Sequence, residues 1–238
     1  MISEHHKDTE MLGTSSLDSF WKYVVRTTGE RSLGKFFWRG FILTLFSNFP
    51  TVAGSYLRGS VYRSLFKRIG SNCFIEKDIH IRIPQKISLG NRVCIGEGCY
   101  LNPQAGRIEI GDNVNIGRRC ILRGDIHIGE WVEISENVYL HGDGGLEIGR
   151  HAHITQGTQI ITGNHIFKDP TRPIMTQGAV LGKVVVGEDV FLGTNSILLM
   201  GVKVGKGSVI GAGAVVTKDI PEYSISVGVP AKVIGKRE

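Results

Sequence analysis

Residues 110–140 read IGDNVNIGRRCILRGDIHIGEWVEISENVYL, and an aliphatic residue stands at every sixth position of this stretch. These positions are Ile110, Ile116, Leu122, Ile128, Ile134 and Leu140. The residue four places after the aliphatic one is usually small or β-branched, as in Val114, Cys120 and Val132. A six-residue period fits neither an amphipathic helix nor an alternating strand, whereas it does fit short strands joined by tight corners in a solenoid.

The same period continues in both directions, with interruptions. Its further aliphatic positions are Ile69, Ile75, Ile81, Leu89, Ile95, Leu101, Ile148, Ile154, Ile160, Val186, Leu192, Leu198, Val204, Ile210 and Val216. The unbroken runs contain three, three, six, three and six hexads, so each interruption follows a multiple of three. If three hexads form one triangular coil, every insertion leaves the solenoid at the same corner, and about seven coils of roughly eighteen residues are expected. The largest interruption lies between Ile160 and Val186, and a loop of that length is more often functional than accidental.

The hexads, together with the run VIGAGAVVTKDIPEYSISVGVPAKVI at residues 209–234, resemble the hexapeptide-repeat acyltransferases. The most similar branch is that of the maltose, galactoside and bacterial polysaccharide O-acetyltransferases, and the resemblance covers residues 69–235. It implies an all-β solenoid, a left-handed parallel β-helix, at residues 69–221, with one extruded loop at 163–183 and a C-terminal tail at 222–238. A left-handed solenoid departs from the usual right-handed crossover. The handedness therefore comes from the resemblance alone.

The composition fits one solenoid domain behind an N-terminal extension. The chain has 238 residues, and its four cysteines lack the pattern of a disulfide framework or a metal site. We therefore expect free thiols in a reducing compartment. Residues 1–30 are expected to be polar and partly disordered, and the first dozen lack the pattern of a cleavable secretory signal. The expected localisation is cytoplasmic.

Residues 31–68 are expected to form a basic amphipathic extension of two short helices broken near Pro50. No acidic residue lies between positions 31 and 75, and the basic residues there are Arg31, Lys35, Arg39, Arg58, Arg63, Lys67 and Arg68. Two roles are open. The segment can cap the solenoid, a task that should need apolar surface but no uniform charge, or it can lie peripherally on the anionic inner face of the cell membrane. Nucleic-acid binding is not expected, because the formal net charge of +6 is modest and no nucleic-acid motif accompanies it.

Chemistry is expected where the long loop begins. Transfer of an acetyl group from a thioester to a hydroxyl needs a base, and the unperturbed histidine pKa of about 6.5 suits that role. In the hexapeptide-repeat acyltransferases the catalytic histidine lies at the start of such a loop, and the resemblance places it at His165. Asn164 and Arg172 of the same loop are candidates for contacts with the substrate.

A second group of candidates lies one coil earlier. Asp143 follows Leu140 in an insertion, and it should approach His165 because both insertions leave the same corner and stacked strands are about 4.8 Å apart. Asp143 can bind a sugar hydroxyl, orient the imidazole, or form a plain turn in a glycine-rich corner. The resembling enzymes carry acidic and asparagine residues in this region, so Asn137, which matches after a register shift of two, is a further candidate.

The other histidines are expected to be ordinary. A zinc site is an alternative, because the γ-type carbonic anhydrases, a related solenoid family, bind zinc through three histidines between subunits. The residues weighed for it are His141, His151, His153 and His165. Their spacing does not reproduce that ligand set, so no metal is expected.

The resemblance also implies that acetyl-CoA binds in a groove between neighbouring subunits of a homotrimer. Carried over position by position, the residues that would contact coenzyme A are Thr194, Ala212, Thr217, Lys218 and Lys232. The two lysines can neutralise phosphate groups as mobile point charges. Phe191 stands where the family usually has tryptophan, and Gly235 replaces a basic residue, which leaves the adenine and phosphate contacts open.

These features predict an acetyl-CoA-dependent O-acetyltransferase that acts on a sugar hydroxyl in surface polysaccharide or glycan biosynthesis. His165 is expected to be the general base for direct transfer, and backbone amides near the base of the loop are expected to stabilise the oxyanion. One alternative is N-acetylation of a nucleotide-linked amino sugar, although no glycine fingerprint of a nucleotide-sugar-binding domain is visible before Ile69. The other alternative is a catalytically silent scaffold.

Overall fold

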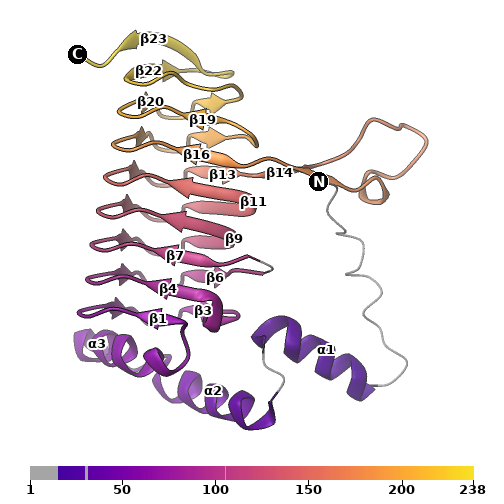
Figure 1. Ribbon diagram of the computed structural model, residues 1–238, viewed down its shortest axis with the longest axis vertical. Helices are drawn as coiled ribbons and strands as arrows, with labels where there is room; N and C mark the ends of the chain where they lie inside the picture. The colour runs from indigo at the N-terminus through magenta and orange to yellow at the C-terminus, as the bar shows by residue number, and fades with distance from the viewer. Residues whose placement is uncertain (1–15, 30–31, 105) are drawn as a thin grey trace.

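The computed structural model is a tall parallel β-helix that stands on a layer of helices (Figure 1). It describes residues 16–29, 32–104 and 106–238. Short strands wind upward from the helices, and one long loop projects sideways from the solenoid. The expected class, a parallel β-solenoid with an α-helical N-terminal extension and an extruded loop, is confirmed.

The coils stack their strands into three columns. The first column contains β1 (Arg68–Ile69), β4 (Ile87–Leu89), β7 (Ile108–Ile110), the ends of β9 (Ile121–Ile128) and β11 (Tyr139–Ile148), β16 (Val184–Val186) and β19 (Lys203–Val204). The second contains β2 (Phe74–Ile75), β5 (Cys94–Ile95), β8 (Asn115–Ile116), β10 (Glu133–Ile134), β12 (His153–Ile154), β17 (Phe191–Leu192), β20 (Val209–Ile210) and β22 (Ser224–Val227). The third contains β3 (His80–Ile81), β6 (Tyr100–Asn102), the starts of β9 and β11, β13 (Gln159–Ile161), β18 (Ile197–Leu198) and β21 (Val215–Val216). Because β9 and β11 run around the corner between the third and first columns, these two columns form one 12-stranded sheet.

The hexad residues form the core. In the third column Leu122 pairs in register with Leu140, and Leu140 pairs with Ile160. All three side chains are 0% exposed. Each coil thus buries its aliphatic residues against the coils above and below, which is the way a solenoid stabilises units that cannot bury a core alone.

Every interruption of the six-residue period leaves the solenoid at one corner, as the spacing predicted. The interruptions follow β3, β6, the start of β11, and β13, all of which belong to the third column. The first contains a 3-10 helix at Pro84–Lys86, and the last forms the projecting loop. Since stacked strands are about 4.8 Å apart, side chains from successive insertions meet along this corner.

Helices α2 (Leu33–Phe46) and α3 (Thr51–Val61) cover the lower end of the solenoid and break near Pro50, as expected. A Cβ atom added at Gly59 of α3 would collide with the carbonyl of Cys73, so this helix packs directly on the first coil. Helix α1 (Ser16–Thr28) falls within the segment expected to be polar and partly disordered. The expectation for residues 1–15 lies outside the described residues, and so does Arg31.

Two arginines of the helical cap bind backbone carbonyls at the lower end of the solenoid. Arg58 is 1% exposed, and its guanidinium donates to the carbonyls of Ile75 at 2.7 Å and Phe49 at 2.8 Å. Arg39 is 6% exposed and donates to the carbonyl of Ile81 at 2.7 Å. Buried carbonyls need hydrogen-bond donors, and these arginines supply them where the coil stacking ends. Two of the basic residues in this segment thus serve the cap itself.

The C-terminal residues 222–238 continue the second column and then fold back on it. Strand β22 pairs in parallel with β20 and begins a further coil. Strand β23 (Lys232–Lys236) pairs antiparallel with β22 and lies at the upper end of the molecule (Figure 1).

Candidate active site

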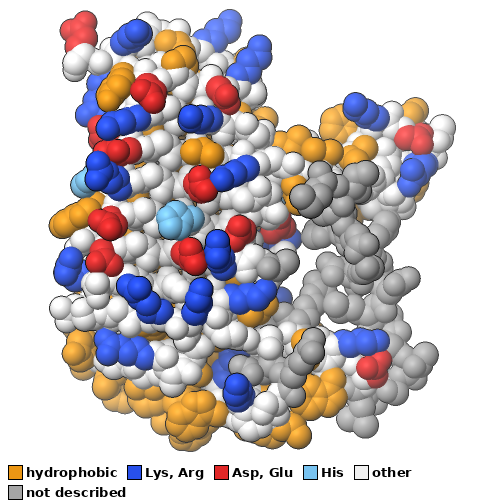
Figure 2. Space-filling view, viewed as in Figure 1, with side chains coloured by type: hydrophobic (Ala, Val, Ile, Leu, Met, Phe, Trp, Pro, Cys, Tyr) orange, Lys and Arg blue, Asp and Glu red, His pale blue; other side chains and the backbone are white. Residues whose placement is uncertain are grey.

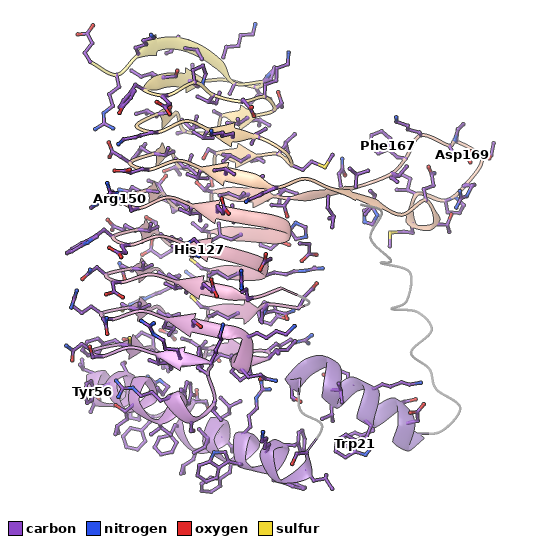
Figure 3. All side chains as sticks on the ribbon, in the orientation of Figure 1. Trp21, Tyr56, His127, Arg150, Phe167 and Asp169 are labelled. Atoms are coloured by element: carbon purple, nitrogen blue, oxygen red, sulfur yellow. The ribbon has the colours of Figure 1, made fainter. Side chains whose placement is uncertain are left out.

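The long loop is held away from the coils by a two-stranded ribbon at its base. Strands β14 (Gly163–His165) and β15 (Ala179–Leu181) pair antiparallel. The loop beyond them, which carries Phe167 and Asp169, projects away from the solenoid (Figure 3). The ribbon therefore fixes His165 where the loop meets the insertion corner.

His165 is half-buried, and its Nδ1 atom is buried without a hydrogen-bond partner among the described residues. A buried polar atom without a partner typically costs about 1–3 kcal/mol, so such atoms are uncommon in folded proteins. His165 itself is partly exposed and lines a cavity, so a ligand there can contact the accessible part of this residue.

A cavity of about 1000 Å³ lies at the base of the loop and follows the insertion corner down toward the helical cap. Three sequence candidates, His165, Asn164 and Asp143, line it together. Lys67 and Lys86 line its lower part. The shared corner thus brings the candidates of two successive insertions to one space.

Asp143 holds two neighbouring side chains in this cavity. Its Oδ2 atom accepts a hydrogen bond from Arg123 at 3.0 Å and lies 3.1 Å from Nε2 of His141. The side chains of Asp143 and His141 are only 16% and 14% exposed. The carboxylate is therefore a fixed part of the cavity wall, where interactions between charges are screened less than on an open surface.

The sequence candidates did not include Arg123 or His141. Each follows an inward leucine of the third column, and β9 and β11 place the two residues opposite each other in register. That register is the signal that would have found them. His141 was expected to be ordinary, and the contact with Asp143 corrects that expectation.

The cavity wall is basic. Its lining includes Lys67, Lys86, Arg107 and Arg123 but only two carboxylates, those of Asp125 and Asp143. Glu109 is outside this lining and forms ion pairs with two of these cations, Lys67 at 3.8 Å and Arg107 at 3.6 Å. A cavity with this excess of cations favours a ligand that carries negative charge.

Two predicted substrate-binding residues lie outside the lining of this cavity. Asn137 is exposed at a coil corner with a φ of 58°, a conformation that asparagine adopts more readily than most residues. Arg172, on the loop, donates a hydrogen bond to the carbonyl of Thr176 at 2.6 Å. Within one chain, the structure does not bring either residue to His165.

The residues predicted to contact coenzyme A lie on the coils above the loop. Thr194 and Ala212 follow β17 and β20 at one edge of the third column. Thr217 and Lys218 follow β21 at its other edge, and Lys232 begins β23. None of the five belongs to the lining of the cavity around His165. The predicted donor residues therefore lie apart from the cavity around His165.

The other histidines weighed as zinc ligands face different surroundings. His151 stacks on Trp131, and His153 makes an edge contact with Phe191. Among the described residues, no three histidine, cysteine, aspartate or glutamate side chains come together in a way that could hold a metal ion.

Comparison with known proteins gives matches in two parts of the solenoid. Residues 107–142 match the bacterial transferase hexapeptide (six repeats), and residues 183–218 match the hexapeptide repeat of succinyl-transferase. A probable acetyltransferase of Mycobacterium tuberculosis is 33% identical over 151 residues, which are 61% of this chain and 50% of that protein. The galactoside O-acetyltransferase of Lactococcus lactis is 34% identical over 141 residues, 58% of this chain and 60% of that protein. The chain thus spans only 50% to 60% of the length of these relatives.

A solved structure shares the fold over most of its length. AntD, an N-acyltransferase from Bacillus cereus in complex with dTDP and 3-hydroxybutyryl-CoA, aligns with a TM-score of 0.53 and 27% identity over 76% of this chain and 88% of that chain. The structural similarity to AntD is consistent with the two repeat matches and with the stacked hexads of the core. The repeat matches, the acetyltransferase relatives and the shared fold support the assignment of this chain to the hexapeptide-repeat acyltransferases.

Proposed function

We propose that this chain is an acetyl-CoA-dependent acetyltransferase that acts on a sugar hydroxyl in the cytoplasmic assembly of a surface polysaccharide or glycan. The observation that carries the proposal is the position of His165, at the base of the loop and in the wall of a cavity that Asp143 also lines. The acetyltransferase relatives and the AntD complex with an acyl-CoA support acyl transfer from coenzyme A.

In the proposed reaction, His165 accepts the proton of the acceptor hydroxyl while the hydroxyl oxygen attacks the thioester carbonyl carbon. The resulting negative charge lies on the former carbonyl oxygen, where preorganised backbone N–H groups near the base of the loop stabilise it. Collapse of the intermediate breaks the C–S bond. The imidazolium then returns its proton to the thiolate of coenzyme A, so no acyl-enzyme forms.

The acceptor lies against the cavity wall in this proposal. Asp143 and Asn164 bind the sugar, while Arg123 and His141 hold the Asp143 carboxylate in place. Asn137 and Arg172 would reach an acceptor only across a subunit interface.

We place the donor between subunits of a homotrimer, against Thr194, Ala212, Thr217, Lys218 and Lys232. The loop supports this assembly, because Phe167 is 63% exposed and Met175 is 65% exposed on a segment that projects from its own solenoid (Figure 3). A neighbouring subunit would bury these side chains and provide the second wall of the donor groove. A fully active monomer in analytical ultracentrifugation would contradict this part of the proposal.

N-acylation of a nucleotide-linked amino sugar is the second candidate. The basic lining by Lys67, Lys86, Arg107 and Arg123 favours an acceptor that carries phosphate, and the AntD complex contains dTDP. The two candidates differ in the bond that they form. An O-acetyl ester is cleaved by hydroxylamine, whereas an N-acetyl amide is stable to it.

The test measures release of coenzyme A with candidate acceptors and then treats the product with hydroxylamine. We expect an ester product, and turnover about 10²- to 10⁴-fold lower in His165→Ala with unchanged coenzyme A binding. His151→Ala is the matched control, because that imidazole stacks on Trp131 away from the cavity. An amide product would favour the second candidate, and the absence of any transfer would favour a scaffold. Wild-type turnover in His165→Ala would remove His165 from the mechanism.

A further inference from the structure

The helical cap turns an apolar surface away from the solenoid. In α2, Leu33, Phe37, Phe41 and Leu45 recur at every fourth position and are each between 54% and 67% exposed. The surface also includes Trp38, Phe49, Val52 and Tyr56, which are between 47% and 74% exposed. We call these eight residues the cap face. Figure 2 shows hydrophobic side chains gathered at the lower end of the molecule, where Figure 1 places α2 and α3.

Helix α2 is apolar on both sides. Ile42 is buried beside Arg39, and Leu43 and Phe46 pack on the core, yet the cap face is apolar as well. A helix on the surface of a soluble protein normally turns its charged side to water. Single exposed apolar residues are common, but a contiguous group of eight large ones marks an interaction surface.

The charge around the cap face has one sign. No acidic residue lies between positions 31 and 75. Lys35 of α2 and Arg63, which follows α3, are both exposed. Arg39 and Arg58 serve the cap internally, whereas Lys35 and Arg63 keep their charges at the surface, where Arg63 also donates one exposed hydrogen bond to the carbonyl of Gly70.

We propose that the cap face docks on the surface of an anionic lipid bilayer. Helices α2 and α3 lie in the headgroup region, and the solenoid stands on the membrane. Aromatic side chains such as Trp38 and Tyr56 suit the boundary between headgroups and acyl chains, and basic residues are attracted by anionic lipid. Within the described ranges, no helix has both the length and the apolar character needed to cross a bilayer.

A lipid surface fits this face better than a second copy of the chain does. End-to-end pairing of two cap faces would bring together two segments that carry basic residues and no acidic residue between positions 31 and 75. Like charges placed together across an interface oppose association. Anionic headgroups complement the same residues and accept the apolar side chains beneath them.

Docking on a membrane would bring a membrane-anchored acceptor to the cavity. This step rests on the proposed acetyltransferase function. Lys67 and Lys86 line its lower part beside the cap, and His165 follows β13, four strand spacings above β3 in the third column. Four spacings correspond to about 20 Å. A membrane-anchored acceptor with several sugar units would therefore extend along the corner from the lipid surface to His165.

The test is co-sedimentation of the intact protein with vesicles of phosphatidylglycerol or of phosphatidylcholine. We expect binding to phosphatidylglycerol at low salt, weaker binding at high salt, and little binding to phosphatidylcholine. The triple variant Phe37→Ser, Trp38→Ser, Phe41→Ser should bind about tenfold or more weakly. Lys35→Gln with Arg63→Gln should weaken binding by about fivefold per residue.

Two controls keep the outcome clear. Trp131→Ser removes a 56% exposed tryptophan from the solenoid wall and should bind vesicles like the parent. Transfer to a soluble acceptor should be unchanged in the triple variant, which separates failure of docking from failure of the proposed function. Absence of vesicle binding at low salt, equal loss in Trp131→Ser, or an end-to-end dimer abolished by the triple variant would each overturn the proposal.

Discussion

The backbone N–H of Thr162 donates a hydrogen bond to Nδ1 of His141 over 3.3 Å. Because Nδ1 accepts, the proton of the neutral imidazole is on Nε2, which faces Oδ2 of Asp143 at 3.1 Å. Thr162 stands directly before the ribbon that carries His165. His141 therefore links the Asp143 carboxylate to the strand from which the loop departs.

We expect Asp143→Asn to raise the KM for the acceptor by about 10- to 100-fold, because hydrogen bonds to charged groups contribute about 1.5–3 kcal/mol. The variant keeps the shape of the side chain but removes the charge that holds Arg123. Steady-state kinetics with each substrate varied separately check the prediction. Asp189→Asn, which loses an exposed ion pair with Arg237, is the control. An unchanged acceptor KM in Asp143→Asn would show that this carboxylate is only part of a turn.

We expect Arg58→Met to lower the free energy of unfolding by about 2–4 kcal/mol, because it leaves buried carbonyls without a donor. The affected carbonyls are those of Ile75 and Phe49. Urea unfolding followed by circular dichroism measures the change. Arg63→Met removes an exposed hydrogen bond to the carbonyl of Gly70 and should shift stability by no more than about 0.5 kcal/mol. Equal effects of the two substitutions would contradict the role given to Arg58.

Two glycines of the cap helices should respond oppositely to alanine. Gly59→Ala places a methyl group against the carbonyl of Cys73, so α3 must move away from the first coil and stability should fall. Gly40→Ala meets no atom within 4 Å and should stabilise α2 by about 0.5–1 kcal/mol. Thermal unfolding measures both effects: the melting temperature should fall in Gly59→Ala and rise in Gly40→Ala. A neutral Gly59→Ala would mean that α3 does not pack closely on the coil.

Burial raises the pKa of Cys73 and of Cys94 above the ordinary thiol value of 9.0. A group whose folded-state pKa is raised contributes stability that is present below its unfolded pKa and is lost as the pH rises through the folded one. We therefore expect the urea midpoint to fall above about pH 9, and alkylation of the native thiols to be slow at about pH 8. Replacing both cysteines with alanine should reduce the alkaline fall. An equally steep fall in that variant would assign it to other groups.

The shared corner of the Asp143 insertion and the long loop follows from the hexad count. Leu140 and Ile160 close complete sets of three hexads, so the insertions after them had to leave the same corner. The shared corner predicts that Asp143 lies close to His165, and both line one cavity. The hexad count did not identify Arg123 as a site residue. Its role depends on its position opposite His141 in the next coil, and nothing in the neighbouring sequence marks that position.

The sequence also did not predict which basic residues of the helical cap would be buried. Arg39 and Lys35 are both basic residues of one amphipathic segment, yet one is buried against a carbonyl and the other is exposed. Helical periodicity placed both on α2 but did not indicate which side of the helix would face the solenoid. Only docking on the first coil decided which charges belong to the fold and which remain for a partner.

The sequence by itself determined the solenoid and the corner of its insertions, because a six-residue period repeats in the chain and each coil buries its aliphatic residues in the same way. The candidate base His165 came from the family resemblance rather than from the period. Tertiary structure decided the contacts of Asp143 with Arg123 and His141, the burial of Arg39 and Arg58, and the exposure of the apolar cap face. The physical reason is that burial of the hexads is a repeated local requirement, whereas those contacts depend on how successive coils and the cap helices settle against one another.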